Sequence, residues 1–176
     1  MARWLHAWRG ALAGLSILGV AAIAGQPLSD DERKERIIEL YAPVRTQFPD
    51  LPHLSVAQLL AEMESRQWVI VDVRPEAERK VSTLPGAVSS TQIEADPQRY
   101  QGQKLVAYCT LGVRSAKWAQ HMRDQGLDVH NLAGSLLAWT HEGGPLVDAS
   151  GAPTRRVHTY SASWDFTPEA YEGVVP

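Results

Sequence analysis

Runs of apolar residues divide this chain into short segments of two kinds. Continuous β-branched or aliphatic runs predict buried strands at 68–73 (WVIVDV), 104–109 (KLVAYC) and 128–132 (DVHNL). A shorter run at 87–90 (AVSS) predicts a further strand. The segment 74–86 between the first run and this one is expected to be loop or broken helix.

Two helices are predicted in the first third of the chain, each opened by a capping box. Ser29 precedes Glu32 by three residues, and apolar positions after it give one buried face, which Pro43 is expected to end. Residues 45–52 then read as a linker. Ser55 with its partner three residues later opens the second helix.

The second half of the chain carries two more helical patterns. Residues 113–126 predict a helix that ends at Gly126, a residue suited to the left-handed cap position. Residues 135–143 predict the last helix, and 92–102 predict a polar helix followed by a turn. The end of the chain is less regular: alternation at 156–164 is compatible with an added edge strand, and the last ten residues predict a loose terminus.

Strands alternate with helices through residues 54–147, a pattern typical of an α/β fold with a mostly parallel sheet and helices on both faces. Ligands of such folds bind at the carboxyl ends of the strands. Cys109 stands at the end of a predicted strand, immediately before a predicted helix. The fold therefore places this thiol where chemistry is expected.

The first 24 residues have the pattern of an export signal. Arg3 and Arg9 precede a continuous apolar run, and the small residues Ala22 and Ala24, at the two positions that a signal peptidase reads, favour cleavage after Ala24. The run is shorter than the roughly 20 residues of a spanning helix, so a cleaved signal peptide is favoured over an uncleaved anchor. Either form places the rest of the chain outside the cytoplasm, in the periplasm of a bacterium.

Net charge and cysteine content limit the functions that this chain can have. Without residues 1–24 the chain has 15 basic and 20 acidic residues, which does not favour binding to nucleic acid, and membrane contact is expected only through an uncleaved leader. Cys109 is the one cysteine, so no internal disulfide can form. A lone thiol in an oxidising compartment is either buried and inert or present to react.

The loop from Cys109 to Arg114 has four intervening residues, Thr110, Leu111, Gly112 and Val113. A strand that turns directly into a helix leaves backbone N–H groups without partners, and curled around a sulfur they form an anion-binding nest. The nest and the charge of Arg114 are expected to lower the pKa of the thiol. A thiolate prepared in this way needs no separate general base. By itself the pattern is also compatible with a small buried cysteine of no chemical role.

Three segments together resemble the signatures of rhodanese-like domains. They are VIVDVRPEAERKVSTLPGAV at 69–88, VAYCTLGVRSA at 106–116 and NLAGSLLAWTHEGGPLV at 131–147. The resemblance covers about residues 54–148 and implies a five-stranded parallel sheet. It also implies that Cys109 accepts sulfane sulfur as a persulfide and passes it to a thiophilic acceptor such as cyanide or a thiol.

This resemblance divides the chain into a leader or anchor (1–24), an N-terminal helix and linker (25–53), a single rhodanese-like domain (54–148) and a C-terminal extension (149–176). Departures from the family pattern occur where Ser82-Thr83-Leu84 replaces Gly-His-Ile and where Gly134-Ser135 replaces Gly-Gly. The second of these lies at the start of the last predicted helix.

Loop length favours sulfur transfer over phosphatase or arsenate chemistry, because the phosphatase relatives carry one more residue between Cys and Arg. The apolar residues of the loop form a poor receptor for thiosulfate, so a protein or low-molecular-weight persulfide is the expected donor, with thiosulfate as the alternative. The expected partners are this donor and a thiol or cyanide acceptor, which a partner protein thiol could supply. A binding or sensing module that uses the cysteine little remains the competing interpretation.

Supporting roles are assigned to Asp72 and Arg74. Asp72 ends a neighbouring strand and is the expected carboxylate partner of Arg114, while Arg74 is expected to pair with Glu76 or Glu78. Trp139 is expected in the core. No metal site and no cofactor are predicted, because no histidine has metal-ligand spacing to another ligand residue.

Overall fold

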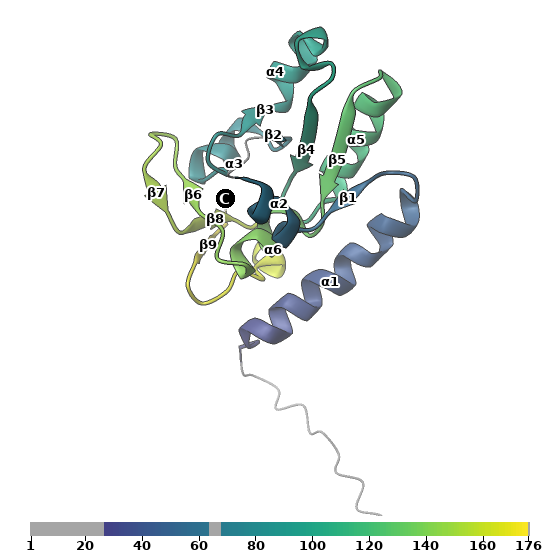
Figure 1. Ribbon diagram of the computed structural model, residues 1–176. Helices are drawn as coiled ribbons and strands as arrows, with labels where there is room; N and C mark the ends of the chain where they lie inside the picture. The colour runs from purple at the N-terminus through teal and green to yellow at the C-terminus, as the bar shows by residue number, and fades with distance from the viewer. Residues whose placement is uncertain (1–26, 64–67, 176) are drawn as a thin grey trace, which may run out of the picture.

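The computed structural model describes residues 27–63 and 68–175, so the predicted leader lies outside the described residues. Its centre is a five-stranded sheet in the order β1-β5-β4-β2-β3, in which every neighbouring pair is parallel. The predicted α/β class and five-stranded parallel sheet are therefore confirmed (Figure 1). The strands are β1 (His53–Leu54), β2 (Trp68–Asp72), β3 (Val88–Ser89), β4 (Lys104–Tyr108) and β5 (Asp128–Leu132).

Helices cover both faces of this sheet. One apolar cluster joins α1, α4 and α5 to the sheet, and a second joins α2 and α6 to the opposite face. Adjacent residues of β4 divide between the two clusters, as alternating strand side chains must. The helices are α1 (Asp30–Gln47), α2 (Val56–Glu62), α3 (Glu76–Val81), α4 (Ser90–Ala95), α5 (Val113–Asp124) and α6 (Ser135–His141), with the 3-10 turn η2 (Pro97–Tyr100) after α4. Within residues 27–63 and 68–175, each helix is too short or too polar to cross a membrane.

Sequence signals for the helix ends are largely confirmed. The capping boxes of Ser29 and Ser55 both form, and Gly126 follows α5 with a φ of +89°. The prediction that Pro43 ends the first helix is wrong, because α1 continues to Gln47 through part of the expected linker. Burial of apolar side chains on both sides of the proline offsets the one backbone hydrogen bond that it removes.

The C-terminal extension is ordered and packs on the domain. Its strand β7 (Pro153–Thr154) forms an antiparallel pair with β6 (Leu146–Val147) of the domain, and β8 (Arg156–His158) pairs in parallel with β9 (Glu172–Val174). The expected edge strand is therefore wrong, since β8 belongs to a separate two-stranded sheet, and the loose terminus is wrong as well. Val157 is fully buried in the α2/α6 cluster, which fixes the extension near α3 (Figure 1).

Candidate functional site

Cys109 follows β4 directly and begins the loop that leads into α5. Its sulfur accepts a hydrogen bond from the Gly112 N–H at 3.0 Å and another from the Ser115 hydroxyl at 3.7 Å. The residue is 2% exposed, yet it lines a pocket that is open to solvent. Of the loop amides at 110–114 that were expected to hold the sulfur, Gly112 donates to it. The other donor is a helix residue, Ser115, that the sequence did not single out.

The surroundings of Cys109 favour its thiolate form. Burial raises the pKa of the thiol, but the opposing effects are larger in total. They are the Ser115 N–H, the positive charge of Arg114, the Ser115 hydroxyl and the Gly112 N–H. The pKa of Cys109 consequently lies below its ordinary value, as predicted for a reactive cysteine.

The loop conformation depends on Gly112 and on α1 behind it. Gly112 has a φ of +123°, a conformation that side chains resist, and a Cβ there would collide with the ring of Tyr41. Its carbonyl accepts a hydrogen bond from Asn131 Nδ2 at 3.1 Å, and the same amide donates to the Tyr41 hydroxyl at 2.8 Å. Burial raises the pKa of Tyr41 to about 12, so the phenol stays neutral.

Helix α6 holds the other side of the loop. The Leu136 N–H donates to the Cys109 carbonyl and the Leu137 N–H to the Thr110 carbonyl, both at 3.1 Å. The Ser135 hydroxyl accepts from the Cys109 N–H at 3.2 Å, with a φ of +50° at Ser135. These hydrogen bonds tie the backbone of the loop to the first turn of α6.

Sequence reasoning missed Tyr41, Asn131, Ser115 and Ser135. Only the last had a usable signal, because Ser135 replaces the second glycine of a family Gly-Gly and takes the left-handed backbone that glycine favours. The others reach the site through tertiary packing.

Arg114 pairs with Glu78, not with the expected Asp72. Its two terminal nitrogens donate to the two carboxylate oxygens of Glu78 at 2.6 and 2.8 Å, and one also donates to the Thr110 hydroxyl at 3.0 Å. The hydrogen bonds to Glu78 raise the pKa of Arg114. The reason is geometric: α3 carries Glu78 to the mouth of the loop, where the arginine lies.

Asp72 is occupied by Arg74, which corrects the expected pairing of Arg74 with Glu76 or Glu78. The guanidinium donates to both oxygens of Asp72, at 2.9 and 2.7 Å, and to the Ser82 carbonyl at 2.6 Å. The Tyr108 hydroxyl donates to the same carboxylate. Burial opposes the charge of Arg74, but Asp72 raises the arginine's pKa overall. This group is enclosed, and it supports the ends of β2 and β4.

The Cys109 pocket has a volume of about 250 Å³. Leu111 packs against Ile37 and Leu137. Val113 lies at the rim of the pocket and is 36% exposed. Two walls come from the C-terminal extension rather than from the predicted loop. The lining residues are Cys109, Thr110, Leu111, Val113, Arg114, Tyr160 and Trp164.

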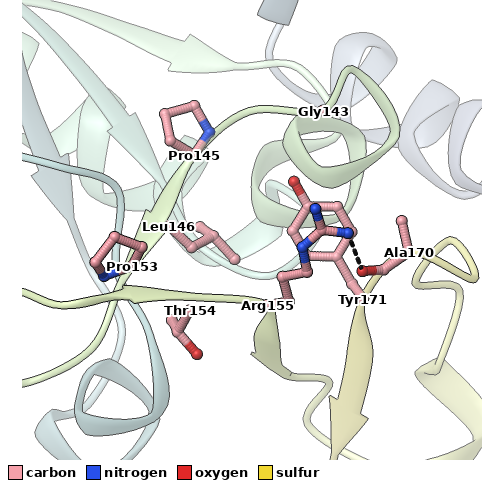
Figure 2. Close-up of a pocket in the computed structure, with 8 residues that line it drawn as sticks. All are labelled: Gly143, Pro145, Leu146, Pro153, Thr154, Arg155, Ala170 and Tyr171. Carbon is pink, nitrogen blue, oxygen red and sulfur yellow. Dashed lines mark hydrogen bonds between the residues drawn. The ribbon is translucent and has the colours of Figure 1, made fainter.

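A larger hollow of about 440 Å³ lies between β6, β7 and the segment before β9 (Figure 2). Arg155 reaches across it and donates to the Ala170 carbonyl at 3.2 Å. None of the eight residues drawn there is a cysteine, a histidine or an acid. The reactive group belongs to the smaller pocket, so that pocket is the candidate active site.

Two further expectations concern the core and metals. Trp139 is fully buried and donates to the Pro145 carbonyl at 3.0 Å, which confirms its place in the core. In the part of the chain that the structure describes, His, Cys, Asp and Glu side chains do not gather in groups of three that could hold a metal ion.

Comparison with known families matches residues 55–142, half of the 176-residue chain, to the rhodanese-like domain. The tRNA uridine(34) hydroxylase of Bacillus pumilus is 29% identical over 97 residues, 49% of this chain and 30% of that protein. The protein of the same name from Burkholderia pseudomallei is 29% identical over 128 residues, 63% of this chain and 43% of that protein. The chain spans less than half the length of either relative.

The solved structures that resemble this fold include two bacterial proteins. A thiosulfate sulfurtransferase from Pseudomonas aeruginosa superimposes with a TM-score of 0.52 and 21% identity, over 68% of this chain and 24% of that one. A protein from Rhodopseudomonas palustris described as a possible tyrosine phosphatase has a TM-score of 0.50 and 27% identity, over 69% of this chain and 99% of that one. At 21% identity, the likeness to the sulfurtransferase shows a shared fold only.

Proposed function

Since the chain belongs to the rhodanese-like domain family, we propose that it is a sulfurtransferase that carries sulfane sulfur as a persulfide on Cys109. The observation that carries the proposal is the sulfur of Cys109 at the floor of a pocket, held by the Gly112 N–H and the Ser115 hydroxyl. These donors stabilise negative charge on sulfur, the form in which a thiol is nucleophilic.

The reaction has two steps. The Cys109 thiolate attacks the outer sulfur of a donor, the bond from that sulfur to the rest of the donor breaks, and the leaving group departs with the electron pair. The enzyme then holds Cys–S–S⁻. An acceptor thiolate or cyanide attacks the terminal sulfur, forms its own bond to it and returns Cys109 to the thiolate. No external oxidant or reductant is consumed.

The loop residues divide between support and contact. Gly112 and Ser115 donate to the reacting sulfur, and Arg114 lies close enough to lower the thiol pKa. Thr110 and Leu111 fix the loop through Glu78 and the α1 interface. Asp72 and Arg74 support the strand ends below the loop.

Phosphatase activity is the second candidate, because the Rhodopseudomonas palustris neighbour is described in those terms. Two features oppose it here: four residues separate Cys109 from Arg114, and both terminal nitrogens of this arginine already donate to Glu78. A phosphate would have to compete with that carboxylate. We expect no hydrolysis of p-nitrophenyl phosphate.

Export is part of the proposal. Residues 1–24 would direct the chain to the periplasm, with the described domain on that side of the membrane. N-terminal sequencing of exported protein tests this: a start at Gly25 supports cleavage, and a start at Met1 supports an anchor.

The direct test of function is mass spectrometry of the protein after exposure to a sulfane donor. The expected product carries one additional sulfur atom on Cys109, which cyanide removes as thiocyanate. Cys109→Ser should lose more than about a thousandfold in turnover, as nucleophile removal does in other covalent enzymes. Full turnover in this variant, or no added sulfur on the unmodified protein, would contradict the proposal.

A further inference from the structure

The C-terminal extension supplies two aromatic walls of the Cys109 pocket. Tyr160 and Trp164 both line it, although both lie beyond residue 142, where the family match ends. They come from the segment between β8 and β9, which includes the 3-10 turn η3 (Ala162–Trp164). The floor of the pocket thus belongs to the matched family domain, and these walls belong to the C-terminal extension.

Tyr160 is held in an unfavourable backbone conformation at the pocket mouth. Its φ is +70°, which is rare for a large side chain, and its N–H donates to His158 Nδ1 at 3.2 Å. Its side chain remains exposed, at 60% for the residue. A strained residue with an exposed aromatic ring beside a reactive sulfur points to a binding role.

Trp164 is fixed from behind. It packs against the cluster of Ile37, Leu111 and Leu137, which joins α1, the Cys109 loop and α6. Because this cluster also contains Leu111, it fixes the position of the indole relative to the Cys109 loop. The two aromatic residues, with Leu111 and Val113, make the pocket predominantly apolar above the sulfur.

The only formal charge among the other lining residues, that of Arg114, already has a carboxylate partner. Arg114 is paired bidentately with Glu78, and its guanidinium lies 5.7 Å from the centroid of the Tyr160 ring. A small dianion entering this pocket would lose hydration without gaining a free cation. An apolar group would instead cover the aromatic walls.

On the basis of the proposed function, we propose that Tyr160 and Trp164 select organic sulfane donors, which carry an apolar body of about one ring and no more than one negative charge. A volume of about 250 Å³ lies below the roughly 300–1,000 Å³ of sites for drug-sized ligands, so the body is small. Aryl persulfides and aryl thiosulfonates have this chemistry.

Three donors that release their outer sulfur to a thiolate test the idea. Benzenethiosulfonate and methanethiosulfonate share one charge and a sulfinate leaving group, and they differ in the apolar body; thiosulfate is a small dianion. In each case the Cys109 thiolate takes the outer sulfur, and benzenesulfinate, methanesulfinate or sulfite leaves with the electron pair. Cyanide discharges the persulfide, and thiocyanate formation gives kcat/KM for each donor.

For the unmodified protein we expect benzenethiosulfonate to exceed methanethiosulfonate by about tenfold or more in kcat/KM, the effect of covering a ring's apolar surface. Thiosulfate should be the poorest of the three. Tyr160→Ala and Trp164→Ala should each reduce the benzene-to-methane ratio several-fold, to a degree set by the area each ring covers. Tyr160→Phe, which keeps the ring, should retain the ratio.

The outcomes separate this inference from the function on which it rests. Transfer from all donors with a ratio near one, or with thiosulfate preferred, overturns the inference and leaves the sulfurtransferase in place. A high ratio that survives Tyr160→Ala and Trp164→Ala also overturns it. If no donor places sulfur on Cys109, the proposed function fails and the inference fails with it. The comparison of donors on the unmodified protein stands even where a variant does not fold.

Discussion

Two arginine–carboxylate pairs lie near the carboxyl ends of the central strands, and they differ in enclosure. The side chains of Arg74 and Asp72 are both 0% exposed, whereas Arg114 is 35% exposed beside Glu78 at 7%. The enclosed pair shares its carboxylate with the Tyr108 hydroxyl below the loop. The second pair borders the Cys109 pocket.

This difference in exposure to water determines what each ion pair contributes. An ion pair without access to water is costly to break, because one uncompensated charge then stays buried. A pair whose arginine is partly exposed at a pocket mouth is partly screened by water, and it sets the charge that a nearby thiol and an incoming ligand meet. We therefore expect the enclosed pair to act mainly on stability and the pair at the pocket mouth to act mainly on reactivity.

The largest predicted effect is on the enclosed pair. Asp72→Asn leaves the Arg74 charge uncompensated and should reduce the free energy of unfolding by about 3 kcal/mol or more, measured by urea denaturation. The matched control is Asp128→Asn, at a half-exposed pair with Arg123, which should leave the midpoint unchanged. Equal effects of the two variants would remove the distinction drawn between the pairs.

The next effect concerns the mouth pair. Arg114→Leu removes a positive charge that lowers the thiol pKa and leaves Glu78 unpaired nearby, so the pKa of Cys109 should rise. We expect kcat/KM at neutral pH to fall about tenfold, in line with one lost charge interaction at a desolvated site. Arg123→Leu, on the same helix and with the same change in net charge, is the control and should retain activity.

The smallest effect has the opposite sign. Glu78→Gln keeps the Arg114 charge and removes its neutralising partner, so the pocket becomes more positive. The thiosulfate rate should rise several-fold relative to the benzenethiosulfonate rate. Glu76→Gln, on the same helix but exposed, should leave the ratio unchanged. A lower relative thiosulfate rate in Glu78→Gln would mean that the pair does not set the charge of the pocket.

Much of the fold was predictable from local patterns. The run DVHNL predicted β5 at its observed bounds, and Gly126 marked the end of α5. The two-residue strand β1 has too few residues for a pattern of its own. The fold class and the place of Cys109 after a strand needed only these local signals together with the chain order.

The partners of the arginines were not predictable in the same way. Sequence proximity favoured Arg74 with Glu76 or Glu78, yet α3 turns Glu78 toward Arg114, 36 residues later. The aromatic walls escaped prediction for a similar reason: β8 pairs with β9 across a gap of 13 residues, and the segment between them carries Tyr160 and Trp164 to the pocket. Such contacts depend on tertiary packing, which local patterns do not encode.

The central claim is that the surroundings of Cys109 lower the pKa of its thiol, and the pH dependence of its alkylation by iodoacetamide tests it most directly. A thiol with a lowered pKa stays ionised to lower pH. The alkylation rate should therefore stay high at pH values below the pKa of a free cysteine, about 8.5. The account predicts a midpoint clearly below that value, shifted upward in Ser115→Ala because one donor to the sulfur is lost. A midpoint at or above 8.5 in the unmodified protein would contradict it.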